Sequence, residues 1–180
     1  MRILISNDDG INSEGLRVLA EVLRTIGEVF IVAPDRDQSA ASHALSLYRP
    51  LRMEEIAQNT YSVDGTPTDC VNLAVNGILK DRRPNLVVSG INKGENLGDD
   101  ITYSGTVSAA IEGTLLGIPS IAVSVVNKNG FRFDTAAYYA LLIAKYVLRT
   151  GLPKGTFINL NIPSLPKEEI KGIKVTRQGK

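Results

Sequence analysis

Residues 2–10, with the sequence RILISNDDG, decide the fold class of this chain. A short apolar run ends in a polar turn, and residues Glu14–Ile26 then have the apolar spacing of a helix. The apolar face of that helix consists of Leu16, Leu19, Ala20 and Leu23. Gly27 follows, where we expect it to end the helix in a left-handed conformation, and Glu28–Ala33 is a second apolar run. A strand, a helix and a strand in this order indicate two parallel strands joined by a crossover helix.

The same alternation continues along the chain. Further strands are expected at Asn85–Ser89, Ser120–Val126 and Phe157–Ile162. Helices are expected at residues 66–79, from the end of the glycine-rich loop at Gly105 to about Leu116, and at Thr135–Arg149. The helix starts are predicted from Thr66 as N-cap with Pro67 and Asp69 after it, and from Asp134 as the cap of the last helix. Shorter extended pieces are expected at Leu45–Leu47, Leu51–Ile56, Tyr61–Val63 and Ile173–Arg177. We therefore predict an α/β, Rossmann-like, doubly wound and mostly parallel sheet with helices on both faces and a β-hairpin excursion.

Length and composition favour a single domain spanning residues 1–180. The chain has 20 basic and 19 acidic residues, so it lacks the basic excess that duplex-binding proteins usually show, and we expect no duplex nucleic acid as a partner. Cys70 is the only cysteine, which excludes an intrachain disulfide, and small core filling is its expected role. No apolar stretch reaches the ~18 residues of a membrane span. We expect a cytoplasmic protein.

Asn7-Asp8-Asp9-Gly10 directly follows the first strand, where ligands bind in open parallel sheets. Adjacent carboxylates repel each other, and a divalent cation such as Mg²⁺ or Mn²⁺ would offset that repulsion. An ordinary Asx turn leading into a helix is an equally good interpretation of these residues alone. The loop after the second strand contains Ser39 and Ser42, whose hydroxyls could bind a metal or a phosphate, but a serine-rich loop is a weak signal by itself.

The third loop, residues 90–105, is long, polar and rich in glycine. Gly90, Gly94 and Gly98 would let backbone amides approach an anion, and Ser104 to Thr106 stand at the start of a helix. The loop is neither a Walker loop nor a dinucleotide fingerprint, because the Gly-Lys-Ser/Thr ending and the glycine spacing are missing. Together with the acid pair, this loop predicts a metal and phosphate site.

These segments resemble the survival protein SurE family, over the length of the chain. The resemblance is carried by residues 3–15 with Asn7-Asp8-Asp9-Gly10, residues 32–39, residues 65–71 (GTPTDCV), and residues 89–113 with SGIN and YSGT. It implies a divalent-metal-dependent 5′(3′)-nucleotidase of the bacterial cytoplasm that releases phosphate from nucleoside monophosphates, with some members also trimming short polyphosphate. It also implies a homodimer or homotetramer.

The resemblance assigns the metal to Asp8, Asp9, Ser39 and Asn92, and the phosphate pocket to Asn96, Ser104, Gly105 and Thr106. One Mg²⁺ or Mn²⁺ per subunit is expected, although oxygen ligands suit Ca²⁺ as well. Family members continue beyond the position of Lys180 with a stretch that builds subunit contacts, so we expect that extension to be missing here.

Asp8 and Asp9 are the predicted catalytic residues, and two routes stay open for them. Either a water activated by the metal attacks phosphorus, or an aspartate acts as base or as nucleophile through an aspartyl-phosphate. Lys93 can contact phosphate or be a solvated lysine, His43 can donate a proton or be structural, and Tyr103 can stack on a base or pack across the loop. The rival function is a non-catalytic nucleotide sensor on the same fold, which would need no acid pair.

Overall fold

A seven-stranded sheet in the order β3-β4-β2-β1-β5-β6-β7 forms the middle layer of the protein, in a computed structural model that describes residues 1–126 and 130–179. The strands are β1 (Arg2–Ser6), β2 (Glu28–Pro34), β3 (Met53–Ala57), β4 (Thr60–Val63), β5 (Leu86–Lys93), β6 (Ser120–Val126) and β7 (Ile158–Pro163). The helices are α1 (Glu14–Leu23), α2 (Pro67–Leu73), η1 (Ala74–Ile78), η2 (Gly98–Thr102), α3 (Gly105–Leu115), α4 (Phe133–Thr150) and η3 (Lys167–Glu169).

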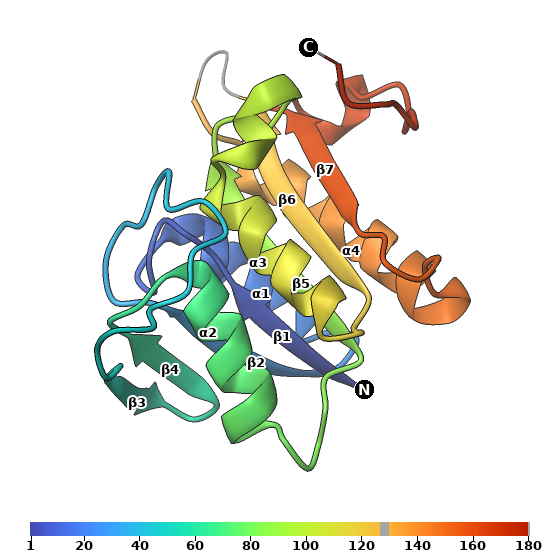
Figure 1. Cartoon of the computed structure of the whole chain (residues 1–180). Helices are drawn as coiled ribbons and strands as arrows, with labels where there is room; N and C mark the ends of the chain where they lie inside the picture. Colours follow the sequence, from blue (N-terminus) through green and yellow to red (C-terminus); the bar gives the residue numbers. More distant parts are fainter. Residues whose placement is uncertain (127–129, 180) are drawn as a thin grey trace.

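Helices cover both faces of the sheet, as Figure 1 shows, with α2 and α3 on one face and α1 and α4 on the other. The alternation of side chains along β1 explains these two layers, because Ile3 and Ile5 pack with α1 and α4 whereas Leu4 packs with α2. Cys70 is buried in the core between the sheet and the helices α2 and α3, which confirms its role as core filling.

All strand pairs are parallel except β3 with β4, which confirms the doubly wound fold. The order of the strands changes direction at the centre of the sheet. From β1 the chain adds β2 on one side, and it later returns to add β5 on the other side of β1. In such sheets ligands bind at this reversal, outside the carboxyl ends of the strands. The loops after β1 and β5 therefore meet where a site is expected.

The predicted hairpin is present, but it is an edge of the main sheet because β4 pairs in parallel with β2. No strand forms at Leu45–Leu47 or at Ile173–Arg177. β5 continues to Lys93, so Gly90 and Asn92 belong to the end of a strand rather than to the following loop.

The predicted start of α2 is confirmed in detail. The Thr66 hydroxyl accepts from the backbone N–H of Asp69, the Asp69 carboxylate accepts from the backbone N–H of Thr66, and Pro67 is the first helical residue.

Two other helix-end predictions were wrong. Asp134 lies inside α4, whose N-cap is Arg132. α1 ends at Leu23, and Gly27 has no left-handed conformation; a Cβ there would lie 2.8 Å from the carbonyl oxygen of Met1. Close packing against the backbone of Met1, rather than helix termination, therefore explains why a glycine is needed at position 27. Among the described residues, no helix is long and apolar enough to cross a membrane.

Candidate functional site

Asp8 lies in the turn after β1 and is 4% exposed. Its Oδ1 atom accepts a hydrogen bond from the hydroxyl of Thr106, which is fully buried near the start of α3. Asn7 stabilises the turn, because its Nδ2 group donates to the carbonyl of Gly10 at 3.0 Å and to the hydroxyl of Ser13 at 2.7 Å. The carboxylate of Asp8 is therefore held between the first turn of the sheet and a helix from the middle of the chain.

Gly105 explains how α3 comes so near. A Cβ atom at this position would lie 2.7 Å from the Cβ of Asp8 and 3.0 Å from its Oδ2 atom. Real Cβ atoms do not approach other heavy atoms this closely, so any side chain at Gly105 would displace Asp8 or the helix start. The glycine of the YSGT segment is thus required by the packing of the helix on the acid pair.

Burial and charge act on Asp8 together. Its burial raises the pKa to about 6, the hydrogen bond from Thr106 opposes that rise, and the neighbouring charge of Asp9 adds to it. A pKa raised this far by burial indicates that water does not reach the Asp8 carboxylate to stabilise its ionised form.

Asp9 lies in the same environment with fewer partners. Burial raises its pKa, the Lys93 ammonium and a backbone hydrogen bond from Lys93 lower it, and the charge of Asp37 raises it. Its Oδ2 atom is buried and has no hydrogen-bond partner among the described residues. A divalent cation fits here, because it would supply the positive charge and the binding partner that this oxygen lacks.

Ser39 reaches this region through the loop that follows β2. The backbone N–H of Gln38 donates to the carbonyl of Asp8 at 2.8 Å, which places the next residue, Ser39, beside the turn. The backbone N–H of Ser39 donates to the Asp37 carboxylate at 2.7 Å. The Ser39 hydroxyl, followed by this backbone contact, lowers the pKa of Asp37. Ser39 itself is exposed.

Asn92 lies at the end of β5, beside the Lys93 that contacts Asp9. Its Nδ2 group donates to the carbonyl of Gly94 at 2.9 Å, so the amide nitrogen is used within the loop and the amide oxygen is the atom suited to a cation. The strand end bulges here, since the register with β6 shifts between Ser89 and Asn92. Gly90, in the bulge, packs so closely on Val123 that a Cβ would lie 2.3 Å from its carbonyl oxygen.

The predicted phosphate residues divide into two groups. Ser104, Gly105 and Thr106 start α3 directly beside Asp8. The Ser104 hydroxyl caps the helix by accepting from the N–H of Val107, and the Thr106 hydroxyl is used on Asp8. Within this group, the backbone N–H groups of the helix start are the donors suited to an anion.

Asn96, in contrast, faces β6 and β7. Its Nδ2 group donates to the hydroxyl of Ser124 at 2.7 Å, and it is 5% exposed. Asn161 of β7 accepts from its backbone N–H at 2.9 Å and donates to its carbonyl at 3.1 Å, and Asn159 donates to the same carbonyl at 2.9 Å. These contacts fix the backbone of the loop.

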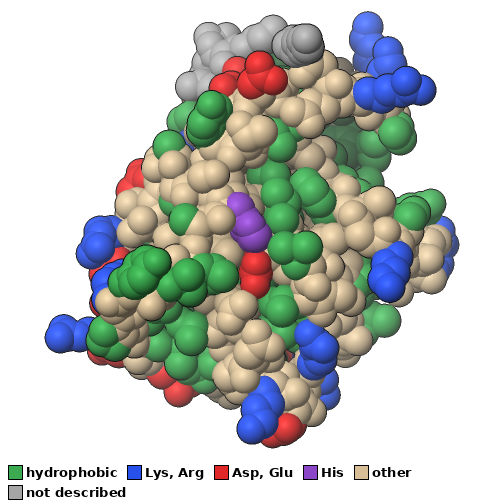
Figure 2. All heavy atoms as spheres, viewed as in Figure 1, with side chains coloured by type: hydrophobic (Ala, Val, Ile, Leu, Met, Phe, Trp, Pro, Cys, Tyr) green, Lys and Arg blue, Asp and Glu red, His purple; other side chains and the backbone are tan. Residues whose placement is uncertain are grey.

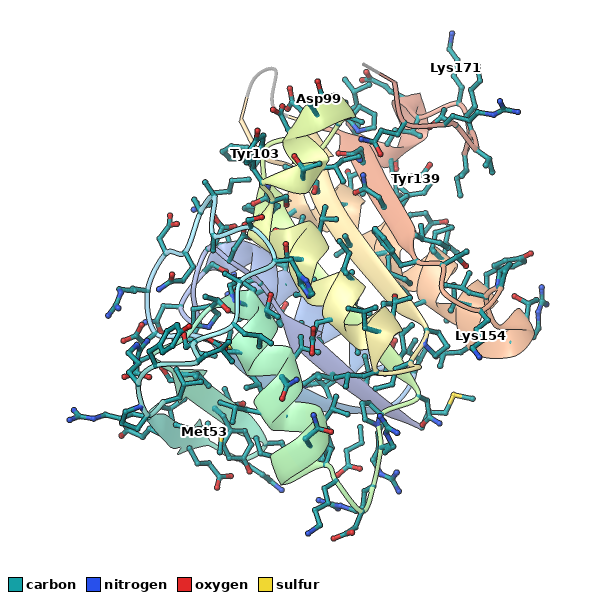
Figure 3. All side chains as sticks on the ribbon, viewed as in Figure 1. Met53, Asp99, Tyr103, Tyr139, Lys154 and Lys171 are labelled. Carbon is teal, nitrogen blue, oxygen red and sulfur yellow. The ribbon has the colours of Figure 1, made fainter. Side chains whose placement is uncertain are left out.

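Sequence reasoning missed the roles of Asn7, Asn159 and Asn161, and it treated Thr106 only as a phosphate contact. One signal was available, since two asparagines alternate along a predicted strand and therefore share one face. Figure 3 shows Tyr103 and Asp99 together at one end of the molecule, and the Tyr103 side chain is 64% exposed. Tyr103 does not pack across the loop as one of its two interpretations required.

The candidate ligands contain only two acidic side chains. Accordingly, no group of three or more His, Cys, Asp or Glu side chains that could hold a metal occurs within residues 1–126 and 130–179. The oxygens available are instead those of two carboxylates, a hydroxyl and an amide, which suit Mg²⁺, Mn²⁺ or Ca²⁺ rather than Zn²⁺.

These observations define a class: a doubly wound α/β protein with a desolvated acid pair against a helix start, at the reversal point of its sheet. The chain belongs to the SurE family, since the family model described as "Survival protein SurE" matches residues 3–180.

Close relatives have the same family name. The chain is 56% identical to "5'-nucleotidase SurE" of Geotalea uraniireducens, covering 100% of this chain and 73% of that protein. It is 54% identical to "5'-nucleotidase SurE" of Vibrio parahaemolyticus, covering 99% and 69%. Among solved structures, the SurE protein from Aquifex aeolicus matches with a TM-score of 0.96 and 52% identity, covering 100% of this chain and 73% of that one.

Proposed function

We propose that this chain is a metal-dependent 5′-nucleotidase that hydrolyses nucleoside monophosphates to nucleoside and phosphate. Membership of the SurE family and more than 50% identity to relatives named 5′-nucleotidase support a hydrolase acting on nucleotides. The observation that carries the proposal is the acid pair, with Asp8 buried against Gly105 and Asp9 retaining an unpartnered oxygen. The comparisons give no support to the alternative of a non-catalytic sensor.

Asp8, Asp9, Ser39 and Asn92 would hold the cation, which we expect to be Mg²⁺ or Mn²⁺. When bound, it would supply charge neutralisation and Lewis acidity toward a phosphate oxygen. Thr106 holds the Asp8 carboxylate in one orientation by donating to its Oδ1 atom. An outer contact of this kind orients a ligand and typically changes metal affinity about 10–100-fold when it is removed.

The start of α3 would bind the phosphate. Its first N–H groups have no intrahelical partners, and the helix dipole favours an anion at this end. α3 spans Gly105–Leu115, and its first residue contacts Asp8, so an anion at the helix start would lie next to the acid pair. Asn96 would keep the loop between β5 and α3 in place through its backbone contacts to Asn161.

Two routes for the attack on phosphorus follow from the same residues. In one, a water attacks in line while an aspartate accepts its proton, and the bond from phosphorus to the nucleoside oxygen breaks. In the other, an aspartate displaces the nucleoside from phosphorus to form an aspartyl-phosphate, which water then hydrolyses to free phosphate and the carboxylate. Hydrolysis of an isotopically chiral thiophosphate analogue of AMP in labelled water decides between them. Inversion at phosphorus supports direct attack by water, and retention supports the covalent route, because each of its two displacements inverts phosphorus.

The test of the proposed function is phosphate release from AMP and GMP with Mn²⁺ or Mg²⁺, with and without a chelator. We expect release that the chelator abolishes and that excess Mn²⁺ restores. Release that is unaffected by the chelator would overturn the metal assignment. A protein that binds nucleotide but releases no phosphate from any monophosphate would restore the sensor interpretation.

Finer features belong to the same proposal. Activity on 3′-monophosphates and on short polyphosphate, the preferred metal and a cytoplasmic location follow from the family resemblance, as does a homodimer or homotetramer. Light scattering on the purified chain measures its oligomeric state, and a parallel assay with 3′-AMP and tripolyphosphate measures its substrate range.

A further inference from the structure

Residues 35–52, here called the β2–β3 loop, connect β2 to β3 without any regular secondary structure. Ser39, a proposed ligand, belongs to this loop and is exposed. A loop of this length inside a compact domain needs contacts to other elements to hold one conformation.

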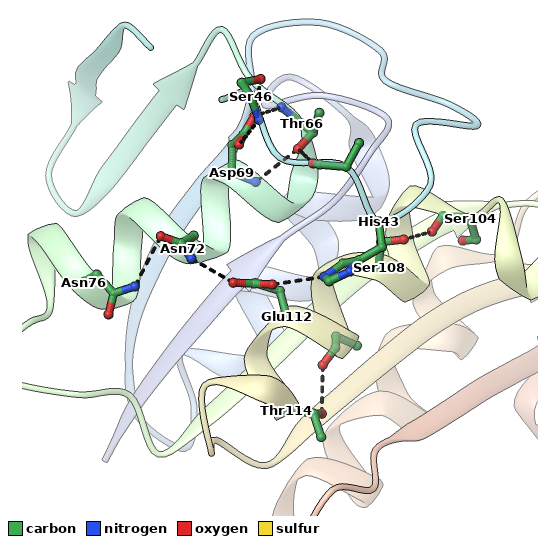
Figure 4. A network of polar contacts seen from close by, with 12 residues as sticks. His43, Ser46, Thr66, Asp69, Asn72, Asn76, Ser104, Ser108, Glu112 and Thr114 are labelled. Carbon is green, nitrogen blue, oxygen red and sulfur yellow. Dashed lines mark hydrogen bonds and ion pairs between the residues drawn. The ribbon is translucent and has the colours of Figure 1, made fainter. Parts of the chain in front are cut away.

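The loop is tied to two helices of one face of the sheet. Its contacts reach residues just before α3, the middle of α3, and the start of α2. These are Ser42 N–H to the Tyr103 carbonyl at 3.1 Å, the Ser42 hydroxyl to the Thr102 carbonyl at 2.9 Å, His43 to Glu112, the Thr66 hydroxyl to the Ala44 carbonyl at 2.7 Å, and Ser46 to Asp69. Figure 4 shows several of these contacts.

His43 makes the one contact of the loop to the middle of α3 within this set. Its Nε2 atom lies 3.0 Å from Oε2 of Glu112, which is 5% exposed. The other oxygen of Glu112 accepts from Nδ2 of Asn72 at 2.8 Å, and Asn76 in turn donates to Asn72 at 3.2 Å (Figure 4). A buried carboxylate is costly unless its oxygens are hydrogen-bonded. Loss of the contact with His43 would therefore leave one oxygen of Glu112 without this partner.

The backbone between Ser39 and His43 is strained. Ala40 has a φ of 59° and Ser42 a φ of 53°, and neither is a glycine. Each left-handed non-glycine residue costs about 1–2 kcal/mol, so this segment would relax if its ends were free. Gln38 on Asp8 and His43 on Glu112 hold those two ends.

His43 contacts α3 at Glu112, beyond the first turn of the helix. Glu112 lies eight residues after Ser104 on α3, which is about 12 Å along the helix axis. Figure 2 shows His43, the single histidine of the chain, at the surface of the face covered by α2 and α3. Its side chain is 32% exposed, whereas that of Glu112 is 7% exposed.

We propose that His43 is a positioning residue: its bond to Glu112 fixes the β2–β3 loop so that Ser39 lies beside Asp8 and Asp9. The role of Ser39 as a ligand rests on the proposed function, whereas the anchoring of the loop by His43 does not. The pair thereby connects the packing of α2 on α3 to Ser39, the proposed ligand that the β2–β3 loop supplies.

The test compares three variants with the wild-type protein. His43→Leu removes the hydrogen bond and keeps the bulk, and His43→Gln restores an N–H donor of similar reach. Asn76→Ala is the matched control, because it cuts the outer end of the same network and leaves Glu112 with both partners. Unchanged hydrogen exchange in β1 and β5 verifies that each variant is folded.

Three measurements are made on each protein. Hydrogen exchange of residues 38–44 in metal-free protein reports the loop, Mn²⁺ titration calorimetry reports the metal site, and kcat and KM with AMP report catalysis. For His43→Leu we expect hydrogen exchange in the loop to rise about tenfold, as for the loss of one hydrogen bond. We expect Mn²⁺ affinity to fall about tenfold, because a contact that positions a metal ligand is lost. His43→Gln should recover most of both losses, and Asn76→Ala should match the wild type.

Wild-type exchange in the loop of His43→Leu would overturn the anchoring by His43. Faster exchange with an unchanged Mn²⁺ affinity would overturn the link from His43 to Ser39. If the wild-type protein itself neither binds Mn²⁺ nor releases phosphate, the proposed function fails, and with it the positioning of a ligand. The exchange measurement then still decides whether His43 anchors the loop, so the two failures are distinguishable.

Discussion

Asp8 is 4% exposed and is held by residues of the core, whereas Ser39 is exposed and is held by a loop without regular secondary structure. Asp8 is fixed by a helix start in which Gly105 stands where a side chain would collide with it. Ser39 depends on contacts made several residues away. This difference teaches that one half of the site is formed by core packing, and that the other half depends on the contacts that hold a loop against two helices.

The largest effect is expected from the core half. Asp9→Asn removes a charge from the proposed metal site and should lower kcat about 10³-fold, which corresponds to the several kcal/mol that a metal ion contributes. Phosphate release from AMP and Mn²⁺ titration measure the loss. Glu95→Gln is the matched control, because Glu95 is an exposed acid in the loop after β5 and is not one of the proposed ligands. Equal losses in both variants would mean that local charge, rather than the acid pair, determines activity.

Gly105→Ala should break the contact between α3 and Asp8. The added Cβ would lie 2.7 Å from the Cβ of Asp8, so we expect a loss of about 1–3 kcal/mol in stability and about 10²-fold in kcat. Gly77→Ala is its control, because a Cβ at that helical glycine meets no atom within 4 Å. Thermal unfolding and AMP hydrolysis are measured for both. An active, fully stable Gly105→Ala protein would contradict the close approach.

A pH series sharpens the electrostatic side of the comparison. The pKa of Asp8 is raised to about 6 in the metal-free folded protein, against 3.8 as its ordinary value. The folded state therefore binds the proton more tightly, and the stability from Asp8 is fully present below about pH 4 and is lost as the pH rises through about 6.

We expect metal-free protein to lose at most about 3 kcal/mol of unfolding free energy across this range from Asp8. Urea unfolding between pH 4 and pH 7 in chelator measures it, and Asp8→Asn should remove this part of the slope. Saturating Mn²⁺ should flatten the wild-type profile near pH 7, because a bound cation favours the ionised carboxylate. The same slope in Asp8→Asn as in the wild type would assign it to other groups.

The parts that local rules govern could be predicted from the sequence. The parallel strands, the cap of α2 at Thr66 and the polar turn after β1 depend on residues close together in the chain, and the structure confirms them, whereas the two extended pieces predicted at residues 45–47 and 173–177 are not strands. The predicted ligand set and phosphate residues remain predictions. The structure adds that Gly105 and Thr106 contact Asp8, a relation between segments 98 residues apart. Neither the spacing of the motifs nor the periodicity of apolar residues predicts such a contact.

The failures have the same cause. Gly27 looked like a helix terminator, but the carbonyl of Met1 is what requires a glycine there. Asp134 looked like a cap, and Arg132 occupies that position instead. His43 pairs with a residue 69 positions further along the chain, so its partner Glu112 could not be found from its neighbours. Tertiary contacts decide each of these cases, and one sequence alone does not list them.

The smallest effect is expected from the loop half of the site. Ser39→Ala removes a neutral oxygen and leaves both carboxylates, so we expect Mn²⁺ affinity to fall about tenfold and kcat at saturating metal to change by less. Ser46→Ala is the control, because it alters the same loop where the loop contacts Asp69 at the start of α2. Calorimetry and AMP hydrolysis at several Mn²⁺ concentrations separate affinity from turnover.

If Ser39→Ala instead matches Asp9→Asn in its effect on kcat, the loop is as necessary to the reaction as the core, and the division between the two halves is wrong. If excess Mn²⁺ restores kcat for Ser39→Ala but not for Asp9→Asn, the carboxylates act on the reacting phosphate while the loop only helps to retain the cation. That outcome would also explain why the residue can lie on an exposed loop: a contribution to affinity tolerates small displacements, whereas the group that acts on the reacting atoms does not.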